Sequence, residues 1–307
     1  FHSEVPACPG ATAYRLTIRR DLPYAQRPMA RVLIVGAGYL ARFLIPILRA
    51  RGDSVVATTR SEKRHALLES LGAEASHLDL DKPDASPLLS PTYDAVVYSA
   101  APGRGGNREL VFRDAPVSVL ERVQGPRLKR FVFTSSIGVY SRTDGSWVDE
   151  DSSPRTEGRK AELLEGEVNL LTVPAPVTVL RLGGLYGPDR SPIDWMSDPT
   201  RRERIARGNP DGYLNWLRIE DAALAVHRVL TADDASPLYN VVDDEPVIRQ
   251  RFYDQACQLG GHAPLTLTGS ADRGKRVRND KLKSELGWAP LFETYVQGLS
   301  DLNGSGD

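Results

Sequence analysis

Residues 32–61, VLIVGAGYLARFLIPILRARGDSVVATTRS, place a glycine-rich turn between an apolar run and a segment with helical spacing. Gly36, Gly38 and Ala41 form a G-x-G-x-x-A pattern at this junction. In such a pattern the first glycine permits a tight turn, the second lets a pyrophosphate approach the backbone, and the small third residue keeps the helix close to the sheet. A second apolar run follows within about 30 residues, so a strand–helix–strand unit that binds a dinucleotide is expected. The alternative is an ordinary strand–helix turn.

The same alternation continues along the first half of the chain. Continuous β-branched runs predict strands at 31–35, 54–59, 94–100, 130–136 and 177–182. Helical spacing appears between them at 39–51, 61–72, 109–124 and 157–171, although Pro46 and Pro116 oppose two of these helices. Strands that are apolar on both faces are typical of a parallel sheet covered by helices on both sides. We therefore expect an α/β fold, a doubly wound parallel sheet of the NAD(P)-binding Rossmann type.

The chain divides into three parts by pattern. Residues 1–28 contain four prolines and weak apolar spacing, so we interpret them as an N-terminal extension, either an upstream segment or a non-native addition, with the natural start at Met29. Residues 29–182 form the expected dinucleotide-binding domain. Residues 183–307 are less regular and are expected to form a smaller α/β substrate-binding lobe, partly interleaved with the first domain. In such folds ligands bind at the carboxyl ends of the strands, which this lobe would cap.

Composition excludes several functional classes. The formal net charge is −1, with no basic field for nucleic acid or a membrane surface. The two cysteines, Cys8 and Cys257, form no disulfide framework, and neither they nor the histidines have metal-ligand spacing. No apolar run approaches the roughly 20 residues that span a bilayer. We expect a soluble, cytoplasmic protein without a metal.

The end of the second predicted strand indicates which dinucleotide binds. NAD enzymes place an acidic residue there to bond the ribose 2′-hydroxyl, whereas an arginine accommodates a 2′-phosphate. This chain has Thr59, Arg60 and Ser61 at that point, with no acid before Glu62. An arginine can hold a phosphate through two hydrogen bonds. The sequence therefore predicts NADP as the cofactor, the alternative being that Arg60 is a solvated surface charge.

A family resemblance becomes specific at FTSSIGVYS, residues 133–141. From Met29 almost to its end the chain resembles the extended short-chain dehydrogenase/reductases of the NAD(P)-dependent epimerase/dehydratase superfamily. Asp79-Leu80, Ala100-Ala101-Pro102 and RLGGLYGP at 181–188 resemble the family's cofactor-contacting segments. The resemblance implies that Ser136 bonds the reacting carbonyl. Together with the glycine loop and the strand end, it gives the expected cofactor contacts: Gly36, Gly38, Tyr39, Leu40, Ala41, Thr59, Arg60, Ser61, Asp79, Leu80, Ala100, Ala101, Pro102, Ser135, Lys160, Gly183 and Leu185.

The resemblance breaks at the catalytic signature. The family carries Tyr-x-x-x-Lys on the helix after the fifth strand, where the tyrosine moves a proton and the lysine lowers its pKa and holds the ribose. Here Lys160 is present, but the residue four before it is Thr156, and a shift by one brings Glu157. A slip of one residue would also replace Lys160 by Ala161 on the helix face. The candidate catalytic residues are Ser136, Lys160, Glu157 and Thr156.

Two functions follow from these residues. The first is an NADP-dependent oxidoreductase or epimerase/dehydratase-like enzyme acting on a small polar substrate, a carbonyl compound or a sugar nucleotide. The second is a non-catalytic NADP-binding sensor or interaction protein. The altered signature resembles the "atypical" extended group, which retains cofactor binding. A small-molecule partner is expected in the first case, and the resemblance implies a homodimer formed through two helices.

Overall fold

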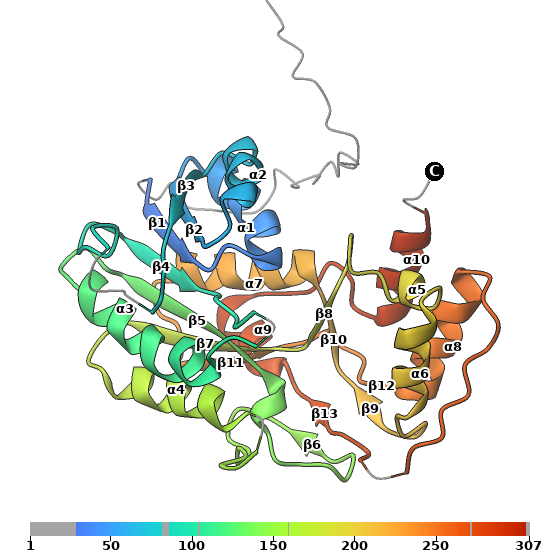
Figure 1. Cartoon of the computed structure of the whole chain (residues 1–307). Coiled ribbons are helices and arrows are strands. Elements are labelled where there is room, and N and C mark those ends of the chain that lie inside the picture. The colour runs from blue at the N-terminus through green and yellow to red at the C-terminus, as the bar shows by residue number, and fades with distance from the viewer. Residues whose placement is uncertain (1–28, 82–85, 104, 159, 271, 305–307) are drawn as a thin grey trace, which may run out of the picture.

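The computed structural model describes residues 29–81, 86–103, 105–158, 160–270 and 272–304. Residues 1–28, interpreted above as an extension, lie outside them. A seven-stranded sheet has the order β11-β7-β5-β4-β1-β2-β3, and every neighbouring pair is parallel (Figure 1). The strands are β1 (Arg31–Val35), β2 (Ser54–Thr59), β3 (Glu74–His77), β4 (Ala95–Tyr98), β5 (Arg130–Ser136), β7 (Val177–Leu182) and β11 (Leu238–Val241). The strand order reverses beside β1, as in a doubly wound fold.

Helices cover both faces of this sheet. In β1, Val32 and Ile34 join one buried cluster, and Leu33 and Val35 join the other. The first cluster is covered by α1 (Tyr39–Ala50), α2 (His65–Ser70), α7 (Ile219–Thr231) and α9 (Asp280–Leu286). The second is covered by α3 (Ala115–Val123) and α4 (Ala161–Thr172), which lie on the opposite side of the sheet in Figure 1. Burial on both faces explains the continuous apolar runs, and the expected doubly wound α/β fold is confirmed.

Two predicted helices differ from the structure near their starts. The segment 109–124 is a π-helical turn, Leu110–Asp114, followed by α3. Pro116 lies in the first turn of α3 and has no N–H to give to the carbonyl four residues earlier, which favours the wider turn. The predicted helix at 157–171 begins only at Ala161. Pro46 lies inside α1 without ending it.

A smaller lobe packs beside the sheet. Its helices are α5 (Pro192–Trp195), α6 (Pro199–Ala206), α8 (Arg249–Leu259) and α10 (Tyr295–Gly304). Short strand pairs accompany them: β8 (Gly184–Tyr186) with β10 (Trp216–Arg218), β9 (Tyr213–Leu214) with β12 (Val247–Ile248), and β6 (Trp147–Val148) with β13 (Arg276–Val277). The Trp216 and Phe252 rings stack 4.5 Å apart in its core.

The chain after residue 182 does not stay in this lobe. It returns to the sheet with α7 and β11 before completing the lobe with α8 and α10. Within the described residues, no helix is long and apolar enough to span a membrane.

Candidate cofactor and active site

A cavity of about 730 Å³ opens at the carboxyl ends of β1, β2, β4 and β5. It is continuous from the glycine loop to Ser136 and Lys160. Sixteen of the residues expected to contact the cofactor line it: Gly36, Gly38, Tyr39, Leu40, Thr59, Arg60, Ser61, Asp79, Leu80, Ala100, Ala101, Pro102, Ser135, Lys160, Gly183 and Leu185. Ala41 is fully buried beneath the loop, where it packs in the core between helix and sheet.

The glycine loop has the geometry of a phosphate cradle. Gly36 has φ +80°, and a Cβ there would lie 2.3 Å from the Ala100 Cα, so only glycine fits. Gly38 precedes α1, and the nearest atom to a Cβ on Gly38 would be 3.9 Å away. That open space lies before a helix whose first N–H groups receive no side-chain cap. The residues therefore fit a dinucleotide whose pyrophosphate sits at this helix N-terminus.

Two arginines lie at the end of the cavity next to β2. Arg60 follows the strand directly, and its exposed side chain reaches across to the loop after β4, where its Nη2 lies 3.7 Å from the position of a Cβ on Gly103. Arg64, from the turn before α2, lines the same end. Lys63 is exposed and is not part of the lining. Arg64 is not among the expected cofactor contacts, and helical spacing does not relate it to Arg60, because Arg60 precedes the turn Glu62–Arg64.

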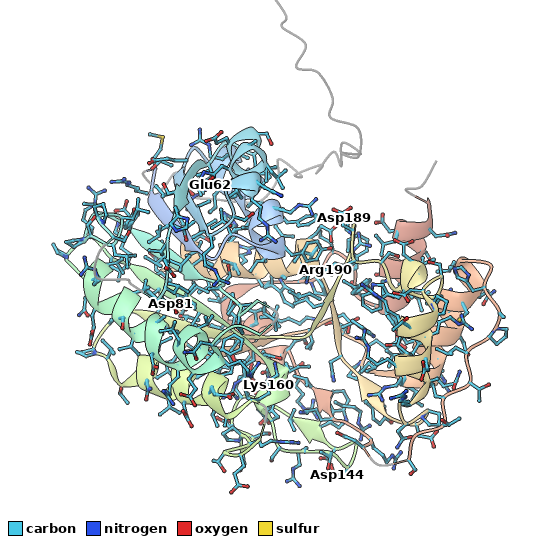
Figure 2. The ribbon with its side chains drawn as sticks, viewed as in Figure 1. Glu62, Asp81, Asp144, Lys160, Asp189 and Arg190 are labelled. Atoms are coloured by element: carbon cyan, nitrogen blue, oxygen red, sulfur yellow. The ribbon has the colours of Figure 1, made fainter. Side chains whose placement is uncertain are left out.

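Ser136 and Lys160 meet at the other end of the cavity. The Ser136 Oγ accepts a hydrogen bond of 3.1 Å from the Gly138 N–H. A Cβ on Gly138 would lie 3.1 Å from the Lys160 Cε and 3.2 Å from the Ser136 Oγ, so both side chains border the same point. Figure 2 labels Lys160 in the lower centre of the view, between Arg190 above it and Asp144 below it.

The helix expected to carry Lys160 begins one residue after it. Lys160 is the residue before α4, and Thr156 and Glu157 precede the helix. Four-residue spacing therefore does not place Thr156 and Lys160 on one helix face. Both Thr156 and Glu157 are exposed and lie outside the cavity lining. The α4 residue that lines the cavity is Leu163.

A buried polar network supports the strand end behind Ser135. The Ser135 hydroxyl donates to the carboxylate of Glu167 on α4. Glu167 accepts hydrogen bonds of 3.0 and 2.7 Å from the Arg181 guanidinium, which lies 4.7 Å from the centre of the Tyr140 ring. Burial raises the pKa of Tyr140 to about 12, and its hydroxyl donates to Asn240 Oδ1 over 2.7 Å. Tyr140 is thus a neutral structural phenol.

Sequence reasoning missed Glu167. The available signal was its position on the apolar face of α4, four residues after Leu163 and three before Leu170. A charged residue on such a face is buried only when an oppositely charged or hydrogen-bonding group pairs with it. Arg181, on the following strand β7, is the partner of Glu167. The pairing itself joins segments that the sequence does not bring together.

Tyr39 is the only tyrosine among the described residues that line the cavity. Its hydroxyl donates to the Pro188 carbonyl over 2.5 Å. Burial, followed by the charge of Glu220, raises the pKa of this phenol above its ordinary value. Tyr39 therefore does not replace the proton-transferring tyrosine of the family signature.

Comparisons with known proteins agree with this geometry. The model of the NAD(P)H-binding family matches residues 36–208, more than half of the chain. The chain belongs to the NAD(P)H-binding family. The span of this chain that matches the family model begins at Gly36. It includes the glycine loop, the two arginines next to β2, and Ser136 with Lys160.

Three proteins illustrate how similar its relatives are. Protein YeeZ of Escherichia coli (strain K12) is 28% identical over 274 residues, which cover 85% of this chain and 95% of that protein. A conserved protein of unknown function from Silicibacter pomeroyi DSS has a TM-score of 0.74 at 28% identity, covering 91% and 100% of the two chains. A short-chain dehydrogenase/reductase superfamily protein from Agrobacterium tumefaciens with bound NAD has a TM-score of 0.72 at 18% identity, covering 90% and 96%. The expected NAD(P) binding is confirmed at the level of the family, and the expected fold is shared with a short-chain dehydrogenase/reductase superfamily protein.

Proposed function

We propose that this protein is an NADP(H)-dependent enzyme that transfers hydride to or from a carbonyl carbon of a small polar substrate, as an oxidoreductase or an epimerase/dehydratase. The observation that carries the proposal is the single cavity that joins a phosphate loop to Ser136 and Lys160. A protein that only bound the dinucleotide would have no need of the Ser136 hydroxyl at the far end, whereas Lys160 would hold the ribose in either case.

Selection of NADP over NAD rests on Arg60 and Arg64. Both line the cavity at the end of β2, and no acidic residue stands between the end of β2 and Glu62. A 2′-phosphate carries negative charge and accepts the paired hydrogen bonds that a guanidinium donates. A carboxylate in the same place would repel it.

The test of cofactor selection is a fluorescence titration with NADPH and NADH. We expect wild type to bind NADPH more tightly, and Arg60→Ala to lose about 10- to 100-fold in NADPH affinity, because a charged hydrogen bond is worth about 1.5–3 kcal/mol. NADH affinity should hardly change. Lys63→Ala is the matched control, a neighbouring exposed cation outside the cavity lining. Equal affinities of wild type for both cofactors would mean that Arg60 is a surface charge.

The catalytic assignment gives each residue a separate task. The Ser136 hydroxyl would donate to the substrate carbonyl, and the Lys160 ammonium would bond the ribose hydroxyls and favour negative charge that develops on the reacting oxygen. The bound nicotinamide supplies or receives the hydride. Proton transfer needs a group other than Tyr39. For Thr156 or Glu157 to serve, the segment before α4 would have to close over the cavity.

The test of catalysis is label transfer from NADPH deuterated at the nicotinamide C4. We expect deuterium to appear in at least one member of a panel of aldehydes, ketones and nucleotide sugars, as read by mass spectrometry. Ser136→Ala should lower that transfer by about 100-fold, the usual effect of removing one donor to a developing oxyanion. Its NADPH affinity should stay close to that of wild type.

A specific observation favours the second candidate, a non-catalytic NADP-binding sensor or interaction protein. Among the described lining residues no phenol is free to move a proton, because the hydroxyl of Tyr39 is bonded to Pro188. Tight NADPH binding without label transfer to any compound of the panel would favour this function over the enzyme.

A further inference from the structure

The segment after β8 forms a tight turn against the dinucleotide cavity. The Arg190 N–H donates to the Gly187 carbonyl over 3.0 Å and closes the turn. Asp189 has φ +62°, and it is the only non-glycine residue with positive φ among the described residues. A left-handed aspartate is uncommon and is retained where surrounding contacts fix it. Figure 2 labels Asp189 and Arg190 together, above and away from Lys160.

Two contacts fix this turn on the first turns of α1. The Tyr39 hydroxyl donates to the Pro188 carbonyl over 2.5 Å, and the Arg42 guanidinium pairs with Asp189 at 2.6 Å. On the other side, Gly187 lies so close to α7 that a Cβ would be 2.7 Å from the Ile219 Cγ2. The turn is therefore held between the helix that follows the phosphate loop and a helix that packs on it.

Arg190 is the residue that this arrangement presents to the cavity. Its guanidinium carbon lies 4.3 Å from the centre of the Tyr39 ring, and Arg190 lines the cavity. Tyr39 is the first residue of α1, directly after Gly38. No carboxylate lies within 4 Å of the Arg190 guanidinium in the described part of the chain, so its charge is not neutralised there.

The cations that line the described cavity occupy three places. Arg60 and Arg64 lie beside β2, and Lys160 lies beside Ser136. Arg190 lies between these ends, stacked on the residue that opens α1. A helix N-terminus offers about half a positive charge, whereas a pyrophosphate carries two negative charges. The phosphate loop by itself leaves most of that charge uncompensated.

We propose that Arg190 binds the pyrophosphate of the dinucleotide, as a cation that the chain supplies from the β8–α5 turn opposite the glycine loop. The proposal rests on dinucleotide binding in this cavity and is independent of hydride transfer. Stacking on Tyr39 holds the plane of the guanidinium, which leaves its N–H groups free to donate to phosphate oxygens. Tyr39 is thus a positioning residue for Arg190, and the turn becomes part of the cofactor site.

The experiment compares three ligands on Arg190→Ala. NADPH and NADH both carry the pyrophosphate, whereas adenosine 2′-monophosphate carries only the 2′-phosphate. We expect Arg190→Ala to weaken NADPH and NADH by the same factor, about 5- to 30-fold, since the side chain is exposed and its charge is partly screened. Binding of adenosine 2′-monophosphate should be unchanged. Arg60→Ala should give the opposite pattern, with losses for NADPH and adenosine 2′-monophosphate only.

Two further variants separate a ligand contact from a structural role. Arg278→Ala is the matched control, an exposed arginine stacked 4.9 Å from the Trp147 ring and away from this cavity, and it should bind all three ligands as wild type does. Tyr39→Phe keeps the ring but removes the bond to Pro188, and should weaken NADPH and NADH equally and less than Arg190→Ala does.

The outcomes distinguish this proposal from the proposed function. Unchanged NADPH and NADH affinities in a folded Arg190→Ala protein would overturn the pyrophosphate contact and leave cofactor binding intact. Equal losses of affinity for all three ligands would also overturn the pyrophosphate contact, because the substitution would then disturb the whole cavity and not one contact. If the wild-type protein bound neither NADPH nor NADH, both the pyrophosphate contact and the proposed function would be overturned.

Discussion

At the scale of single residues, the environment of Lys160 differs from that expected of a helical catalytic lysine. Lys160 stands before α4, its side chain passes Gly138, and the first helical turn gives Leu163 to the cavity in place of a charged group. Its ammonium is therefore carried on a loop residue beside Ser136. This position still allows it to reach a ribose hydroxyl or a developing negative charge in the cavity.

Lys160→Ala distinguishes the two candidate functions. We expect the variant to bind NADPH about 5- to 20-fold more weakly, because a charged hydrogen bond to the ribose is lost. In an enzyme, the hydride-transfer rate at saturating NADPH should fall by about a further 10- to 100-fold. Lys129→Ala is the control, an exposed lysine next to the opposite end of β5. Unchanged affinity and unchanged rate would remove Lys160 from the site.

At the scale of elements, α4 approaches the π-helical turn before α3 unusually closely. A Cβ on Gly166 would lie 1.8 Å from the Phe112 carbonyl oxygen and 2.9 Å from its carbon. Phe112 is four residues before Pro116, so its carbonyl lacks the helical N–H that another residue would supply. Gly166 allows the backbone of α4 to pack against this freed carbonyl.

Gly166→Ala should therefore destabilise the protein although alanine is the better helix former. Alanine favours a helix by about 1 kcal/mol over glycine, but the overlap with a backbone carbonyl forces the two elements apart. We expect a net loss of about 2–4 kcal/mol in the free energy of unfolding, measured by urea denaturation. Gly304→Ala, at a glycine in α10 with nothing within 4 Å, should be neutral or stabilising. A Gly166→Ala protein as stable as wild type would contradict the close contact.

Elements differ in how far they could be predicted from sequence. The βαβ unit was predictable because its signals are local: a continuous apolar run from Val32 to Val35, buried on both faces, and a glycine pattern within one short segment. The start of α4 and the π-helical turn were not, because they depend on contacts between segments, such as Gly166 with Phe112. The same applies to Arg190, whose aromatic partner Tyr39 is far away in sequence.

At the scale of the whole molecule, the start of α7 connects the sheet to the C-terminal segment of the lobe. Arg218, just before α7, donates to the Gly298 carbonyl over 2.6 Å and pairs with Asp301 at 2.9 Å. Asp221, in the first turn of α7, accepts the N–H groups of Leu291 and Phe292 at 2.6 and 3.2 Å. Because α7 also packs on α1, these two residues join the lobe to the dinucleotide-binding sheet.

This junction should make stability depend on pH through Asp221. Burial raises the pKa of its carboxyl from 3.8 to about 7, and the negative charge of Glu220 raises this pKa further. The hydrogen bonds from the two N–H groups lower it, but by less than burial raises it. Between these values the folded state keeps a proton that the unfolded state has lost, so the free energy of unfolding falls as pH rises. Above about pH 7 the carboxyl is ionised in both states and this contribution stops changing. His227 acts in the opposite direction, because burial lowers its pKa from 6.5 to about 4 and its contribution to stability rises with pH over that range.

Asp221→Asn isolates the carboxyl from His227. Asparagine keeps an oxygen that can accept the Leu291 N–H but does not titrate, so we expect the variant to gain stability relative to wild type as pH rises from about 4 to about 7. The difference between their free energies of unfolding should change by about 1 kcal/mol per pH unit, since one proton corresponds to 1.36 kcal/mol per unit. Urea denaturation at each pH measures it, and Asp234→Asn, at an exposed site, should run parallel to wild type. If the Asp221→Asn and wild-type curves also run parallel, the carboxyl has the same pKa in both states and the connection between α7 and the C-terminal segment does not depend on its protonation.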